Sequence, residues 1–128
     1  MPRFAVFLTA LLLAQSPAGK FSGNWSGATG ASGDFHITLE PASGGAWKCE
    51  VAFTLGEAKV TTKITSVKVD GAKVRTVYEF DLGGNKLEST IEGELGGDSL
   101  SGKYKTRSLE NNSPVDEGTF QATRPKGA

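Results

Sequence analysis

Apolar and polar residues alternate along most of the chain after residue 20. Within residues 47–55, every second position is apolar, namely Trp47, Cys49, Val51, Phe53 and Leu55. Lys48 and Glu50 lie between them, and the same period of two recurs over residues 35–39, 74–80 and 87–95. A period of two predicts strands with one buried and one solvated face, which is typical of antiparallel sheets.

Glycine-rich turn segments separate these runs: Ser43-Gly44-Gly45, Asp70-Gly71, Gly83-Gly84-Asn85 and Gly96-Gly97-Asp98. Such residues supply the positive φ angles of tight hairpins. The pattern predicts eight strands, at about residues 21–28, 33–40, 46–55, 58–69, 73–81, 86–95, 99–107 and 116–124. In the fourth of these, Val60 and Ile64 share a parity that Val67 lacks, so a β-bulge is expected near Thr65 and Ser66.

The sequence therefore predicts an all-β fold, an eight-stranded antiparallel meander. Two architectures bury one face of such a sheet. A closed up-and-down barrel removes the exposed sheet edges, whereas a sandwich normally needs longer, crossing connections. The uniformly short turns favour the barrel.

The first residues have the features of a signal peptide. Arg3 precedes an apolar run from Phe4 to Leu13, and Ser16 and Ala18 suit cleavage after Ala18. The run is shorter than the roughly 20 residues of a membrane span. We therefore expect a signal peptide over residues 1–18, a single barrel domain over 19–128, and a secreted or periplasmic product with no membrane span.

The charge of the chain is balanced, with 14 basic and 14 acidic residues. Nucleic-acid-binding proteins carry a basic surplus, so a nucleic-acid partner is not expected. Cys49 is the only cysteine, and an intramolecular disulfide is therefore excluded. The fold must be stabilised by its hydrophobic core.

No constellation typical of catalysis or metal binding stands out. His36, the only histidine, shares a face with polar neighbours and should face solvent. Cys49 shares a face with Trp47 and Val51 and is expected to be a small buried side chain without a base beside it. The sequence predicts no cofactor, no metal site and no enzymatic activity.

The inward face is predicted to be rich in aromatic residues. An eight-stranded barrel is either filled by its side chains or holds one small molecule. Inward glycines such as Gly93 and Gly102 leave space for a cavity, or let large neighbours lie down. If a cavity exists, the candidate ligand-binding residues are Trp47, Phe53, Tyr78 and Tyr104.

Gly23-Asn24-Trp25 on the first strand and Arg124 on the last resemble the lipocalin and avidin group of calycin-type barrels. The resemblance implies that Trp25 closes one end of the barrel and that Arg124 packs across it through a cation–π contact. The alternative is that Trp25 is simply a large core residue.

Three functions remain open. The first is a secreted binding module for a small apolar or amphipathic molecule. The second is a protein-interaction barrel, such as a periplasmic inhibitor of a protease or lysozyme, acting through Gly19–Gly23 and the loop at 108–114. The third is an enzyme whose acid–base groups the pattern does not reveal.

Overall fold

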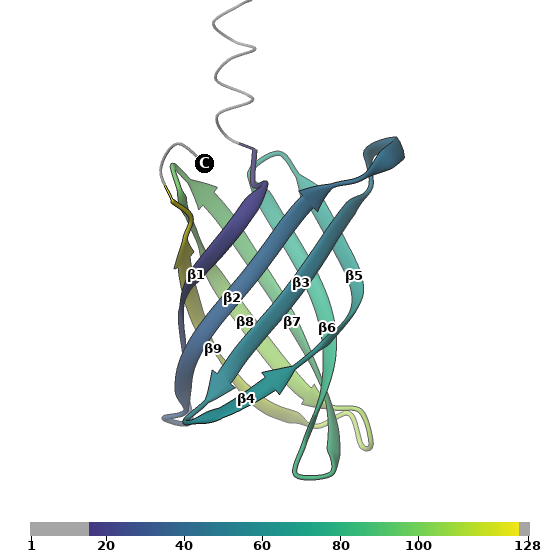
Figure 1. Cartoon of the computed structure of the whole chain (residues 1–128). Coiled ribbons are helices and arrows are strands. Elements are labelled where there is room, and N and C mark those ends of the chain that lie inside the picture. The colour runs from purple at the N-terminus through teal and green to yellow at the C-terminus, as the bar shows by residue number, and fades with distance from the viewer. Residues whose placement is uncertain (1–15, 126–128) are drawn as a thin grey trace, which may run out of the picture.

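Nine antiparallel strands form one sheet that curls into a nearly closed barrel in the computed structural model, which describes residues 16–125 (Figure 1). In chain order the strands are β1 (Gly19–Gly27), β2 (Ser32–Pro41), β3 (Trp47–Leu55), β4 (Ala58–Thr61), β5 (Lys63–Asp70), β6 (Lys73–Leu82), β7 (Asn85–Gly96), β8 (Ser99–Ser108) and β9 (Pro114–Thr123). The predicted all-β meander is confirmed. Most of the expected signal peptide lies outside the described residues, and within them no helix is long and apolar enough to cross a membrane.

The strands are paired in the order β4-β3-β2-β1-β9-β8-β7-β6-β5. Strands that are consecutive in sequence pair with each other, except for β4 and β5, which are the two edges of the sheet. The first and last strands also pair, with Trp25 opposite Phe120. Residues from the two ends of the chain therefore meet along the line where the meander closes on itself.

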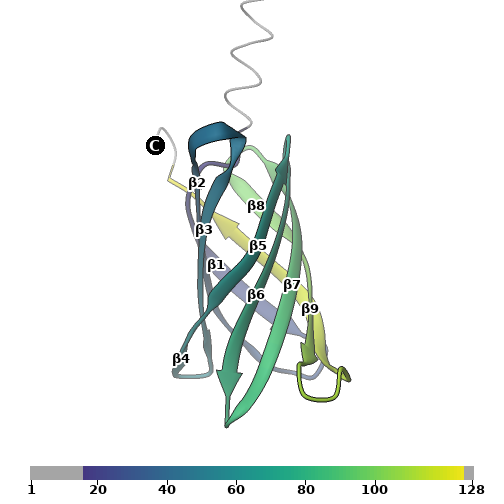
Figure 2. The ribbon, with the colours of Figure 1, turned by 90° about the vertical axis from the view of Figure 1, so that its right-hand side faces the viewer.

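The barrel has a seam, which divides the predicted fourth strand. Residues 58–61 pair with β3, and after Thr62 the chain crosses over to pair with β6 instead (Figure 2). The hydroxyl of Thr62 donates a hydrogen bond to the carbonyl oxygen of Val51 at 2.6 Å, which bridges β3 and the crossover. The register shifts between Ile64 and Ser66, so the predicted bulge is confirmed.

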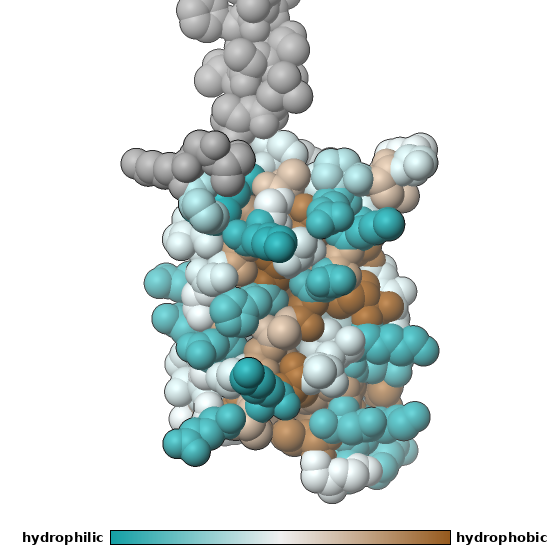
Figure 3. Space-filling view, in the orientation of Figure 1, coloured by the Kyte–Doolittle hydropathy of each residue, from teal (hydrophilic) through white to brown (hydrophobic). Residues whose placement is uncertain are grey.

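The inner face forms one apolar core, as the alternation predicts. Phe21, Ile37, Leu39, Ile91 and Leu100 are at most 1% exposed. The half-buried apolar residues gather beside the seam, on β3 and β5, where brown apolar surface shows between polar side chains in Figure 3. Neighbouring strands cover the other inward side chains from both sides, whereas residues 47–51 of β3 and the outer edge of β5 have no paired strand along the seam.

Two pairs of inward glycines face each other across neighbouring strands: Gly93 with Gly102, and Gly27 with Gly118. A Cβ atom on Gly102 would clash with the carbonyl oxygen of Glu92. At Gly93 the same space is taken by the ring of Phe120. These glycines therefore let strands approach and large side chains lie across them, rather than leaving empty volume.

The two ends of the barrel differ. At the terminal end, which is the upper end in Figure 1, β1 begins and β9 finishes. The loop end is formed by the turns at 28–31, 56–57 and 83–84 and by the loop at 109–113.

Candidate functional site

A cavity of about 170 Å³ opens at the loop end of the barrel. Residues from seven strands and from the turn at 28–31 line it: Trp25, Thr29, Ala31, Phe35, Phe53, Leu55, Tyr78, Phe80, Leu82, Leu87, Ser89, Ile91, Tyr104, Thr106, Val115, Asp116 and Phe120. Val115 lies at its mouth and is the exposed large hydrophobic side chain within residues 16–125. The barrel is therefore filled at the terminal end and hollow at the loop end.

The cavity wall is largely aromatic, and Trp25 is its organising residue. Its indole packs edge-on against Phe53 and Tyr104, with ring centroids 6.0 and 5.7 Å away. The indole N–H donates to the carbonyl oxygen of Thr54 at 2.8 Å. Because the polar atom of Trp25 is bonded to the wall, its ring faces are left for apolar contacts.

Two hydroxyl groups lie against each other in the cavity wall. Ser89 on β7 and Thr106 on β8 are 2% and 7% exposed. Their side-chain oxygens are 2.5 Å apart, in a cross-strand hydrogen bond. Paired in this way, the hydroxyls avoid the cost of buried polar groups without partners, so the wall remains compatible with an apolar occupant.

A carboxylate stands at the mouth. The hydroxyl of Tyr104 donates to Asp116 Oδ2 at 2.7 Å, and the hydroxyl of Thr29 donates to Asp116 Oδ1 at 3.1 Å. Gly27 makes this pairing possible, because a Cβ atom there would lie 2.6 Å from the Tyr104 hydroxyl and would clash with the carboxylate of Asp116.

Both tyrosines of the cavity are held neutral. Burial raises the pKa of Tyr78 well above its ordinary value. Burial also raises the pKa of Tyr104, and the hydrogen bond to Asp116 and its negative charge act in the same direction. The two phenols therefore act as hydrogen-bonding groups and not as acids near neutral pH.

Three of the four predicted ligand-binding residues, Phe53, Tyr78 and Tyr104, meet in this cavity. Trp47 does not, because it begins β3 at the opposite, terminal end, opposite Pro41. Thr106 and Asp116 were missed. Parity along their strands marks both as inward-facing, since Thr106 follows Tyr104 by two positions and Asp116 precedes Phe120 by four.

The expected contact between Trp25 and Arg124 is absent from the structure. Arg124 instead lies over the ring of Phe21, 5.3 Å from its centroid. The register explains the difference: Ser22 is opposite Thr123, so the position opposite Arg124 is Phe21 at the terminal end. Trp25 lies four residues further along β1, at the cavity.

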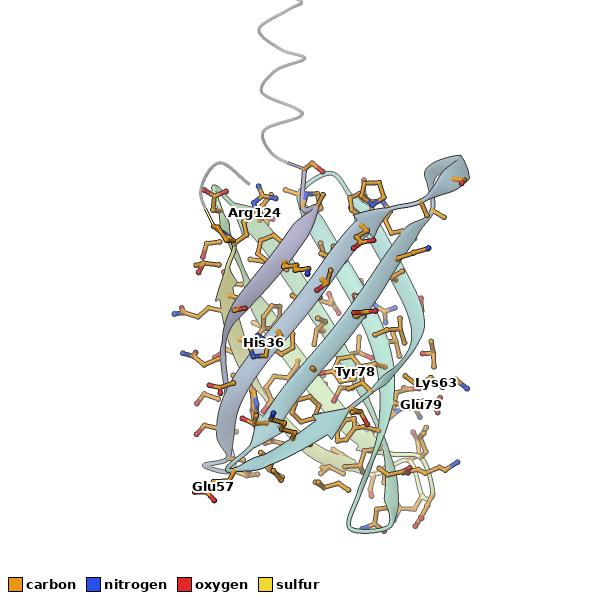
Figure 4. The ribbon with its side chains drawn as sticks, viewed as in Figure 1. His36, Glu57, Lys63, Tyr78, Glu79 and Arg124 are labelled. Atoms are coloured by element: carbon orange, nitrogen blue, oxygen red, sulfur yellow. The ribbon has the colours of Figure 1, made fainter. Side chains whose placement is uncertain are left out.

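Arg124 ties together the terminal end of the barrel (Figure 4). Its guanidinium donates to Asp98 Oδ1 at 3.0 Å, in the turn between β7 and β8. It also donates to the carbonyl oxygens of Ser16 and Ala18, each at 2.6 Å. Pro17, between those two residues, is buried. Arg124 is thus a structural residue, remote from the cavity.

The other candidates for chemistry lie outside the cavity. His36 is on the outer face of β2, as predicted, with Nδ1 3.0 Å from the hydroxyl of Ser22 (Figure 4). Cys49 is half-buried on the inner face, 3.8 Å from the hydroxyl of Thr76. Burial raises the pKa of the Cys49 thiol to about 11, which disfavours the reactive thiolate.

No protein-family model matches the sequence, and no curated protein is similar to it in sequence. The functional argument therefore rests on the geometry of the cavity.

Proposed function

We propose that this chain is a binding module, without catalytic activity, that holds one small apolar or amphipathic molecule in the cavity at the loop end. The observation that carries the proposal is a hollow of about 170 Å³ with aromatic walls and a few polar groups at defined places. Apolar walls with few, placed polar groups are typical of small-molecule sites.

The volume limits the size of the ligand. An apolar cavity of about 150 Å³ is large enough to bind benzene, whereas sites for drug-sized ligands occupy roughly 300–1,000 Å³. We therefore expect a ligand whose buried part is one aromatic ring or a short alkyl chain. Longer ligands would extend out of the mouth past Val115.

The alternative of a protein-interaction barrel has less support. Gly19–Gly23 forms part of β1 and pairs with β2. The loop at 109–113 is closed on itself by hydrogen bonds from Ser108 N to Ser113 O and from Asn112 N to Ser108 O. Neither segment presents a large exposed apolar side chain.

We also propose that the protein is exported from the cell or to the periplasm, on the basis of the signal-peptide features of residues 1–18. N-terminal sequencing of the protein recovered from the medium or periplasm tests it, and we expect the chain to begin at Gly19. The resemblance to lipocalin-like barrels adds the architecture and the use of a barrel mouth for ligands, while the Trp25–Arg124 contact that it implied is replaced by Arg124 over Phe21.

Fluorescence titration with toluene tests binding. Trp25 lines the cavity and Trp47 does not, and the chain has only these two tryptophans. The variant Trp47→Phe therefore reports on Trp25 alone, and we expect saturable changes in its emission. Ala31→Leu places a larger side chain in the cavity and reduces its free volume, so this variant should abolish the changes in emission. Ala52→Leu, on the exposed outer face, should leave them intact. Unchanged Trp25 emission throughout the titration would contradict the proposal.

A further inference from the structure

We propose that the ligand of this cavity carries a protonated amine, and that the carboxylate of Asp116 holds it at the mouth. This inference rests on the proposed function and adds the chemical class of the ligand.

Asp116 has acceptor capacity left. Its side chain is half-buried, and its two oxygens receive hydrogen bonds from the neutral hydroxyls of Tyr104 and Thr29. An ionised carboxylate offers about four acceptor positions. Within residues 16–125, the ion pairs formed are Arg75–Glu92, Arg107–Glu88 and Arg124–Asp98, so no basic side chain forms an ion pair with Asp116.

The rest of the cavity suits a cation attached to an apolar group. Among the lining residues in the described part of the chain, Asp116 alone carries a formal charge. Seven of the lining residues are aromatic: Trp25, Phe35, Phe53, Tyr78, Phe80, Tyr104 and Phe120. The faces of aromatic rings attract cations, and the attraction increases where water is excluded.

The turns at the rim contribute acidic and no basic side chains of their own. The turns at 28–31, 56–57 and 83–84 and the loop at 109–113 contain Glu57 and Glu110 but no lysine or arginine. Glu57 stands exposed at the loop end in Figure 4. Arg107 lies beside the loop at 109–113, where it donates hydrogen bonds to Glu88 and Asn112. The carboxylate that faces the cavity is that of Asp116, and a carboxylate at a low-dielectric opening attracts cations and repels anions. A carboxylate-bearing amphiphile, such as a short fatty acid, is therefore a poor fit.

Three probes with the same ring and nearly the same length separate the charge from the apolar contact: phenethylamine, phenethyl alcohol and phenylacetate. Calorimetric titration of the full chain at neutral pH and low salt gives their affinities. Because a charged hydrogen bond at a half-exposed site is stronger than a neutral one, we expect the amine to bind about tenfold more tightly than the alcohol. Phenylacetate should bind more weakly than either.

Asp116→Asn removes the charge while keeping the shape of the side chain. We expect this variant to bind phenethylamine and phenethyl alcohol with similar affinity. Glu117→Gln is the matched control, because Glu117 is adjacent on β9 and exposed, and it should keep the preference. Gly27→Ala gives a second variant in which the carboxylate is displaced and not removed, and it should also reduce the preference.

The outcomes separate the two proposals. If the unaltered chain binds the amine and the alcohol equally, the amine inference is overturned and the binding function stands. If Asp116→Asn retains the full preference, Asp116 is not the anchor and the inference is likewise overturned. If none of the three probes binds at millimolar concentration, and toluene also fails, the proposed function falls and the amine inference falls with it.

Discussion

Arg124 packs its guanidinium group over the ring of Phe21, with 5.3 Å between the guanidinium carbon and the ring centroid. The side chain of Arg124 is 12% exposed, and its ion-pair partner Asp98 is 37% exposed. The contact therefore lies in a largely water-excluded place at the terminal end, where an ion pair and charged hydrogen bonds are stronger than at the surface.

Arg124→Ala should lower the free energy of unfolding by about 1–3 kcal/mol, because it removes the charged hydrogen bonds of the guanidinium and uncovers Phe21. Urea denaturation of the purified chain measures the change. Arg75→Ala is the control: its side chain is 55% exposed and 4.0 Å from Glu92, so a change within about 0.5 kcal/mol is expected. Equal effects of the two substitutions would contradict the structural role of Arg124.

Cleavage after Ala18 would alter the surroundings of Arg124. The carbonyl oxygens of Ser16 and Ala18, which accept its hydrogen bonds, would leave with the signal peptide. Arg124 would keep Asp98 and Phe21. A chain that begins at Ser16 should therefore be more stable than one that begins at Gly19, and thermal unfolding of the two chains checks this order. Identical midpoints would show that residues 16–18 add no stability.

The alternation along the chain was sufficient to predict most of the fold, because each strand has only one way to place a row of apolar residues inward. It also located the bulge near Thr65, since parity changes there. It did not show that the fourth strand divides at Thr62. That division depends on which neighbour each half reaches, and both halves keep the same local pattern of residues.

The candidate site was harder to predict, because it too depends on how the strands are placed relative to one another. Parity shows that Trp47 and Phe53 point inward, but the depth of each in the barrel depends on strand register and tilt. Trp47 and Phe53 are six residues apart on one strand, and the structure places them at opposite ends. Asp116 was missed although it begins the predicted last strand, because a carboxylate at the end of a strand is ordinarily solvated and parity alone does not show that a cavity lies beside it.

The hydrogen bond between Ser89 and Thr106 predicts a non-additive pair of substitutions. Ser89→Ala or Thr106→Val alone leaves one buried hydroxyl without its partner, at a cost of about 1–3 kcal/mol. The double variant removes both hydroxyls and should cost less than the sum of the single variants by about 1 kcal/mol. Chemical denaturation of the four chains gives this coupling energy. Strict additivity would show that the two hydroxyls do not depend on each other.

Two glycines on neighbouring strands should respond in opposite ways to alanine. Gly102 has the carbonyl oxygen of Glu92 where a Cβ atom would be, whereas Gly96 has open space around that position. Gly102→Ala should destabilise the barrel by about 1–3 kcal/mol through overpacking. Gly96→Ala should be neutral or stabilise by up to about 1 kcal/mol, because alanine restricts the unfolded chain. Thermal unfolding of both variants measures the contrast, and similar melting temperatures would contradict it.

Cys49 should react slowly with alkylating reagents. Burial raises the pKa of its thiol to about 11 from 9.0, which lowers the fraction of reactive thiolate near pH 8. A thiol of higher pKa is also a better nucleophile, so part of this loss is recovered, and we expect alkylation about tenfold slower than in the urea-unfolded chain. Because Cys49 is the only cysteine, mass spectrometry follows the reaction directly. Equal rates in the folded and unfolded chains would contradict the burial of Cys49.

Tyr78 and Tyr104 are the only tyrosines, so the absorbance of tyrosinate reports on the cavity alone. Their pKa values are raised in the folded chain, while those of the unfolded chain lie near 10. The folded chain therefore retains two protons that the unfolded chain loses above about pH 10. Stability from this source is fully present below that pH and is lost as the pH rises through the folded pKa values. We expect tyrosinate to appear only together with loss of the β-sheet circular dichroism signal. Ionisation of both tyrosines near pH 10 in a chain that is still folded would show that water reaches the phenols and that the cavity wall is open at Tyr78.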